Sequence, residues 1–243
     1  MKILRLLRSV IGLLNPRTWG PFIETFEASK FDHALSVSWA QAGEDLALVS
    51  VLGQIPHGRY LDIGAHHPSR FSVTRALYQR GWRGVNVDAN KDLLPKFEQG
   101  RPLDLNLNYC VGDLSEYQIA IFEEPAISTV SKEWQEKFLN ERQVIREFRV
   151  VQGISLERLV TENFREGQLI FLNIDIEGAD FDALLSLNLT NLKKDLWPLW
   201  VMVETAPPIE RALSTPSVSY LVSHGYSPFL VLPNATLLRL NQS

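Results

Sequence analysis

The sequence predicts an α/β fold in which a mostly parallel sheet of seven strands closes with an antiparallel hairpin. Short apolar segments alternate with segments of helical spacing from residue 60 to residue 224, which is the pattern of repeated βα units. A glycine-containing turn follows the first apolar segment, at residues 62–65. Two apolar segments near the end flank Pro233-Asn234-Ala235, and this spacing predicts the closing hairpin.

The expected elements follow in chain order. A helix is expected over residues 40–54, because Leu46, Val49 and Leu52 recur at helical spacing and Glu44 and Asp45 favour the dipole of the first turn. Parallel strands are expected at residues 60–63, 84–87, 105–111, 169–174 and 199–203. Further helices are expected at residues 71–80, 91–99, 179–187 and 217–224, and the hairpin strands at 229–232 and 236–240. Helices should therefore cover both faces of the sheet.

The chain is expected to divide into an N-terminal extension, residues 1–38, and a single domain, residues 39–243. The domain carries an insertion at about residues 114–155, with strands expected at 118–122 and 148–151 and a helix at 132–143. An insertion beside the carboxyl ends of the strands suits a lid or a wall of a substrate site. A surface elaboration without that role is the alternative.

The first fourteen residues, MKILRLLRSVIGLL, have the pattern of a basic amphipathic helix. Arg5 and Arg8 interrupt the apolar core that a signal peptide needs, and the segment is too short to span a bilayer. Two uses stay open: contact with a membrane surface or a partner, and cover for the chain's own core. We expect a cytoplasmic protein, with peripheral membrane contact through residues 1–14 under the first reading.

Composition excludes several classes of protein. The single cysteine, Cys110, excludes a disulfide framework and a cysteine-based zinc site within one chain. The formal net charge of −4 gives no electrostatic case for nucleic-acid binding. A neutral or anionic small-molecule substrate stays possible, because a binding site depends on local and not on net charge. The sequence does not predict the oligomeric state.

The turn after the first expected strand is the first candidate for ligand binding. Gly64 allows the backbone to turn sharply after Asp62, but the segment is not the three-glycine dinucleotide fingerprint. The second expected strand ends in Asp88, where an acid can accept hydrogen bonds from two ribose hydroxyls. A cofactor that carries ribose without a pyrophosphate points to S-adenosylmethionine.

Polar residues at the end of the fourth expected strand are the second candidate. A period of two places Asn173, Asp175 and Glu177 on one face, and burial cost favours their opening into the crevice. Carboxylates there could bind a divalent ion, hold the methionine amino group or act as a base. A helix N-cap is the alternative. Glu204 ends the fifth strand and should face the same crevice, while His66 could act as a base or line the substrate site.

Four segments, taken together, resemble the FkbM-type methyltransferases. They are Gln41-Ala42-Gly43-Glu44-Asp45, residues 61–68 (LDIGAHHP), residues 81–88 (GWRGVNVD) and residues 173–180 (NIDIEGAD). Arg70-Phe71-Ser72-Val73-Thr74 also resembles a family segment in which Asn stands where this chain has Val73, and residues 124–129 (EPAIST) resemble another. The resemblance covers about residues 38–205.

The resemblance implies a class I, Rossmann-like methyltransferase fold and O-methylation of a hydroxyl on a sugar, a polysaccharide or glycolipid precursor, or a secondary metabolite. It implies S-adenosylmethionine as donor, and we expect the cofactor to be bound by Asp62, Gly64, Ala65, Asp88 and Asp113. The expected catalytic residues are Asp175, Glu177 and His66. Related sugar methyltransferases place metal ligands after this strand, so Mg²⁺ is an expected ion on Asp175, Glu177 and Glu204.

Two rival functions are weighed against this one. A nucleotide-sugar dehydrogenase or epimerase would need the three-glycine turn that the chain lacks. A methyltransferase-like scaffold without catalysis would not need the intact set of Asp62, Gly64, Asp88 and the Asp175–Glu177 pair.

Overall fold

The computed structural model of the chain describes residues 37–206 and 208–241. The amphipathic helix expected in residues 1–14 lies outside these residues. No helix within the described part of the chain is both long and apolar enough to cross a membrane.

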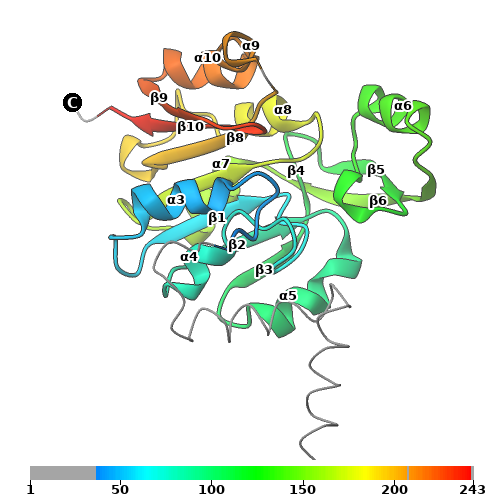
Figure 1. The fold of residues 1–243 in the computed structure, drawn as a ribbon, viewed down its shortest axis with the longest axis horizontal. Coiled ribbons are helices and arrows are strands. Elements are labelled where there is room, and N and C mark those ends of the chain that lie inside the picture. Colours follow the sequence, from blue (N-terminus) through cyan, green and yellow to red (C-terminus); the bar gives the residue numbers. More distant parts are fainter. Residues whose placement is uncertain (1–36, 207, 242–243) are drawn as a thin grey trace, which may run out of the picture. The chain divides into compact units, whose positions relative to one another are not determined.

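The central sheet has seven strands in the order β3-β2-β1-β7-β8-β10-β9 (Figure 1). Neighbouring strands from β3 to β8 are parallel, and β10 is antiparallel to both β8 and β9. This confirms the predicted fold class. The bounds are β1 Arg59–Ile63, β2 Arg83–Asp88, β3 Leu105–Asn108, β7 Leu169–Ile174, β8 Trp200–Glu204, β9 Tyr226–Val231 and β10 Ala235–Leu240. Because the strand order reverses at β1, a crevice is expected at the carboxyl ends of β1 and β7.

Helices cover both faces of the sheet because side chains alternate along each strand. Leu61 and Ile63 pack in one buried cluster with α7 (Leu156–Asn163), α8 (Asp180–Leu185) and α10 (Pro216–Ser223). Tyr60 points the other way and packs with α3 (Glu44–Leu52) and α4 (Arg75–Gln79). The shorter elements are η2 Lys91–Leu93, α5 Leu94–Gly100, η4 Lys194–Leu196 and α9 Ile209–Leu213.

The insertion forms a second sheet beside the first, in the order β4-β6-β5. Its elements are β4 Cys110–Val111, β5 Glu116–Phe122, η3 Pro125–Ile127, α6 Lys132–Asn140 and β6 Ile145–Ile154. The prediction of one strand over residues 105–111 was wrong. The chain leaves the edge of the central sheet after Asn108, and Cys110 and Val111 pair instead with β6.

Helix α7 has no counterpart among the predicted elements, although its sequence carries the signal. Leu156, Leu159 and Val160 are buried at helical spacing, and the Ser155 hydroxyl accepts a hydrogen bond from the Arg158 amide at 3.2 Å. Only one residue separates the end of β6 from the start of this helix, so no turn segment in the sequence marks where the helix begins.

Candidate functional site

Two cavities open side by side at the carboxyl ends of β1, β2 and β7. The first cavity is lined by Asp88, Tyr109 and Thr129, among others, and its empty volume is about 610 Å³ with the open solvent at its mouth included. The second cavity, of about 600 Å³ on the same measure, is lined by Glu44, Asn173 and Glu204. The residues that line both are Gly64, His66, Ala126, Asp175 and Glu177.

Gly64 is required by a close approach of two backbone segments. Its φ is +77°, and a Cβ built there would lie 1.8 Å from the Asp175 carbonyl oxygen. The amides of Gly64 and Ala65 both donate to the Val87 carbonyl, at 3.0 and 3.2 Å. Gly64 therefore lets the turn after β1 lie directly against the turn after β7.

Asp88 lies at the end of β2 with its carboxylate on the wall of the first cavity. One carboxylate oxygen accepts from the His66 amide at 2.9 Å and the other from the Asn90 amide at 2.7 Å. Each oxygen of a carboxylate has two lone pairs, so both can still accept from a ligand. Burial raises the pKa of Asp88 to about 6. The predicted place of this residue is confirmed; its role toward ribose stays a prediction.

Asp62 is placed differently from what the sequence suggested. Its carboxylate is buried on the α3 and α4 side of the sheet, where it accepts from the Thr74 hydroxyl and from the Asn173 amide. Burial raises its pKa although Arg101 lies nearby. Neither Asp62 nor Ala65 is among the residues that line the two cavities. Asp62 therefore supports the turn after β1 without lining either cavity.

Arg101 is the centre of this support, and sequence reasoning missed it. Its side chain is fully buried and donates to the Pro68 carbonyl at 3.0 Å, the Thr74 hydroxyl at 2.7 Å, the Asn86 amide oxygen at 3.2 Å and the Ser72 hydroxyl. The guanidinium thus ties the segment after Gly64 to the sheet. An arginine after a helix-ending glycine carries no sequence signal of such burial.

The turn after β7 departs from regular strand alternation. β7 ends at Ile174, and Glu177 and Gly178 both have left-handed backbones, with φ of +53° and +87°. Asn173 remains in the strand, 4% exposed, with its amide bonded to Asp62. Asn173, Asp175 and Glu177 nevertheless all line the second cavity, as the predicted opening into the crevice requires.

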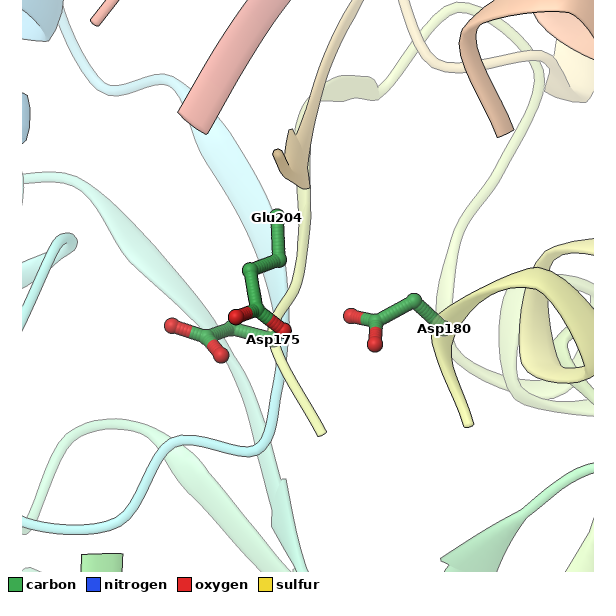
Figure 2. Close-up of side chains that lie close together, drawn as sticks. All are labelled: Asp175, Asp180 and Glu204. Carbon is green, nitrogen blue, oxygen red and sulfur yellow. The ribbon is translucent and has the colours of Figure 1, made fainter. Parts of the chain in front are cut away.

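Three carboxylates gather at this turn. Oxygens of Asp175, Asp180 and Glu204 all lie within 4.8 Å of one another, and Figure 2 shows Asp180 pointing toward the other two from the start of α8. The predicted metal set named Glu177 in the place of Asp180. The Asp180 carboxylate also accepts from the amides of Ile176 and Gly178, each at 3.2 Å. Asp180 therefore shapes the turn as well as completing the cluster.

Burial and mutual repulsion hold protons on these groups. Burial, then the charges of Asp180 and Glu177, raise the pKa of Asp175 well above its usual range, although its side chain is reached by solvent. Burial, then the charges of Asp175 and Asp180, raise the pKa of Glu204 to about 9. Burial and the charge of Asp180 raise the pKa of Glu177 to about 7. At neutral pH Glu177 is thus poised between its two protonation states.

His66 lines both cavities from a left-handed backbone, with φ of +51°. Arg70 Nη1 lies 3.1 Å from its Nε2, and because guanidinium has no acceptor, Nε2 must accept. Its Nδ1 is buried without a hydrogen-bond partner among the described residues. Burial and Arg70 lower the pKa of His66 to about 4, so the ring is neutral at pH 7.

The structure and the sequence analysis differ on which residues belong to the site. Asp113 is exposed after β4 and does not line the first cavity. Glu44 and Asp180 were missed as site residues, although both belong to the segments that carry the family resemblance. Their signal was an acid in the first turn of a helix, which is also what an ordinary helix start contains.

The chain is similar to several solved methyltransferase structures at low identity. A TehB-like SAM-dependent methyltransferase from Corynebacterium glutamicum is 12% identical over 94% of this chain and 100% of that chain, with a TM-score of 0.41. A human methyltransferase 10 domain containing protein is 11% identical over 94% and 98%, at 0.44. Fibrillarin from Aeropyrum pernix, solved with natively bound S-adenosyl-L-methionine, is 12% identical over 80% and 74%, at 0.40.

No curated protein matches the chain. The family described as the methyltransferase FkbM domain matches residues 62–226, which is more than half of the 243 residues. The matched range begins in β1 and ends at the start of β9, so it includes every residue that lines the first cavity, while Gln41, Glu44, Asn234 and Ala235 of the second cavity lie outside it. The chain belongs to the FkbM methyltransferase family.

Proposed function

We propose that the protein transfers a methyl group from S-adenosylmethionine to a hydroxyl of a sugar, of a polysaccharide or glycolipid precursor, or of a secondary metabolite. The proposal rests mainly on the position of Asp88. This residue lines the first cavity at the end of β2, and each of its carboxylate oxygens accepts one hydrogen bond and has a lone pair free for a second. A ribose with two free hydroxyls matches that capacity.

The described residues fit S-adenosylmethionine as the ligand of the first cavity. Beside Asp88 the lining includes Ala89, Tyr109, Val111 and Ile119, which offer apolar and aromatic surface to an adenine ring. Gly64 and Asp175 line the end that adjoins the second cavity, where the methionine part would lie. Asp88 would hold the ribose. Asp62 and Ala65 would act from beneath the turn rather than by contact.

The second cavity would hold the acceptor, because it shares its wall with the first. The bound cofactor supplies a methyl group already activated on a sulfonium, so the protein's task is alignment and removal of the hydroxyl proton. We assign the proton to Glu177, since a base is most effective when its pKa lies near the working pH. His66 suits this role less well, because Nε2 already accepts from Arg70.

The charge of the second cavity bears on the acceptor. Its lining includes the carboxylates of Glu44, Asp175, Glu177 and Glu204, and no lysine or arginine among the described residues. Carboxyl groups form hydrogen bonds with sugar hydroxyls whether they are protonated or ionised, and without a cation in its lining the cavity offers no partner to an anion. We therefore propose an acceptor without phosphate or carboxylate groups near the methylated hydroxyl.

A divalent cation is the second way to prepare the hydroxyl. The observation that favours it is the cluster of Asp175, Asp180 and Glu204, whose oxygen donors suit Mg²⁺. Such an ion would lower the pKa of a hydroxyl bound to it. Loss of turnover with a chelator, restored by Mg²⁺, would decide for the ion; turnover that is unchanged by the chelator would leave Glu177 as the sole assigned base.

The remaining proposals concern the ends of the chain and its location. We propose that residues 39–243 form one methyltransferase domain and residues 1–38 an extension whose basic segment, residues 1–14, contacts membranes from the cytoplasm. Sedimentation with anionic vesicles, compared between the full chain and a chain that begins at residue 38, tests that contact.

One experiment tests the proposed function as a whole. S-adenosylhomocysteine affinity is measured first, and a panel of sugars and polyols is then incubated with methyl-labelled cofactor, with and without Mg²⁺. Cofactor binding with label in a hydroxyl of one acceptor supports the proposal. Binding of a nicotinamide cofactor in its place would indicate the dehydrogenase alternative, and binding of neither cofactor would indicate a scaffold without catalysis.

A further inference from the structure

The turn that carries Asp175 and Glu177 is held in an unfavourable backbone conformation. Glu177 and Gly178 are consecutive left-handed residues, with φ of +53° and +87°. Only glycine adopts this region without cost, so Glu177 persists there because its surroundings hold it. Within the segment that follows β7, the amides of Ile176 and Gly178 donate hydrogen bonds to the Asp180 carboxylate.

The insertion contacts the same turn at the Glu177 carbonyl. Thr129 Oγ1 donates to the Glu177 carbonyl at 2.7 Å, and this is the one hydrogen bond between the insertion and residues 175–178 in the described part of the chain. Thr129 is also the one hydrogen-bond donor to the Glu177 carbonyl among the described residues. Thr129 therefore satisfies the acceptor that the strained turn exposes.

Thr129 is itself fixed from several directions. It is 1% exposed, and its backbone exchanges hydrogen bonds with Ala120 of β5 at 3.0 and 3.2 Å. Its hydroxyl also accepts from the Ser131 amide at 2.9 Å, which orients the hydroxyl proton toward Glu177. A donor this constrained can fix the position of the group it binds.

A second contact of the insertion closes over the same turn. Trp134 of α6 lies so near Gly178 that a Cβ on that glycine would fall 2.0 Å from the Trp134 ring. The ring therefore packs directly against Gly178. The insertion thus contacts residues 177–178 through one hydrogen bond and one packing contact.

We infer that Thr129 is a positioning residue for methyl transfer: its hydroxyl fixes the Glu177–Gly178 turn, and thereby the Glu177 carboxylate between the two cavities. This inference rests on the proposed function, because it takes Glu177, which lines both cavities, to act on the acceptor. It gives the insertion a role in the reaction itself, not only in enclosing the site. Thr129 does not touch the acceptor; it acts through the turn.

The test compares Thr129→Val, which removes the hydroxyl at nearly constant shape, with Thr129→Ser, which keeps it. The matched control is Thr161→Val on α7, where a threonine hydroxyl likewise donates to a carbonyl, that of Glu157 at 2.9 Å, away from both cavities. The first measurement is amide hydrogen exchange in the full chain. Exchange at Ile176 and Gly178 should accelerate at least tenfold in Thr129→Val, and stay near wild type in Thr129→Ser and Thr161→Val.

The second measurement is turnover with an acceptor from the screen. In Thr129→Val kcat should fall about tenfold, as expected for one lost hydrogen bond. Thr129→Ser should restore kcat. Unchanged exchange at Ile176 and Gly178 in Thr129→Val, or unchanged kcat, would overturn the inference. A wild-type chain that methylates no acceptor would overturn the proposed function, and the exchange data would still decide whether Thr129 holds the turn.

Discussion

Replacing Glu204 by Gln should stabilise the ligand-free protein at neutral pH. The pKa of Glu204 is raised to about 9 by burial and by Asp175 and Asp180, against a usual value of 4.5. Between these values the folded carboxyl keeps its proton while the unfolded one releases it. Stability is therefore full below pH 4.5 and is lost as the pH rises toward 9. Gln does not titrate, so the variant avoids this loss.

The magnitude follows from the shift. At pH 7 the unfolded carboxyl lies about 2.5 pH units above its pKa, which corresponds to an upper limit of about 3.4 kcal/mol. Solvent reaches the half-buried side chain and screens part of this, so we expect about 1–2 kcal/mol. For a domain of this size the gain in Tm is about 2–8 °C.

The assay is thermal unfolding of both chains with chelator present, at pH 5 and at pH 7. The gain of Glu204→Gln should be small at pH 5 and larger at pH 7, and the exposed residue Glu210 supplies the control variant Glu210→Gln, with no gain at either pH. A Tm for Glu204→Gln that equals or falls below wild type at pH 7 would refute the reasoning. If Mg²⁺ then raises the Tm of wild type but not of the variant, Glu204 contributes to a cation site.

Three further predictions concern the site. Glu177→Gln should lower kcat at least 100-fold while S-adenosylhomocysteine still binds. The wild-type kcat should rise as the pH increases through about 7, because the base acts only when it is deprotonated. A flat pH profile or an active variant would show that Glu177 is not the base. Gly64→Ala should lower Tm by more than Gly167→Ala, because both glycines have positive φ but only the Cβ at residue 64 meets another atom within 4 Å; equal effects would show that the contact with Asp175 can relax. Neutral glycosides should be methylated with a kcat/KM at least tenfold above that of their phosphate esters, and the reverse order would contradict the assigned role of the acidic second cavity.

The sheet could be predicted from the sequence because each βα unit has a recognisable local pattern of apolar and turn-forming residues. Buried strands such as β7 are short apolar runs, and glycine or proline residues mark the ends of several elements. The split of residues 105–111 into β3 and β4 could not be predicted in this way. That split depends on pairing with β6, some forty residues later, and no glycine or proline within residues 105–111 marks it.

The candidate site was predictable in its location and less so in its detail. Asp88, Asp175 and Glu204 follow strands, and the topology alone brings them to one edge of the sheet. The carboxylate of Asp62 accepts from Thr74 and Asn173, and Arg101 in turn donates to Thr74, contacts that nothing in the local sequence distinguishes. The hydrogen bond from Thr129 to Glu177 joins residues 48 positions apart and is equally invisible to local patterns.

The central claim is that the first cavity binds S-adenosylmethionine through Asp88. Calorimetric titration of wild type and Asp88→Ala with S-adenosylhomocysteine tests it most directly, with Asp113→Ala as the matched removal of an exposed carboxylate outside that cavity. We predict one site per chain in wild type and in Asp113→Ala, and an affinity at least 100-fold weaker in Asp88→Ala, since hydrogen bonds to a charged group contribute about 1.5–3 kcal/mol each. Equal affinity of wild type and Asp88→Ala, or no binding to wild type, would contradict the account.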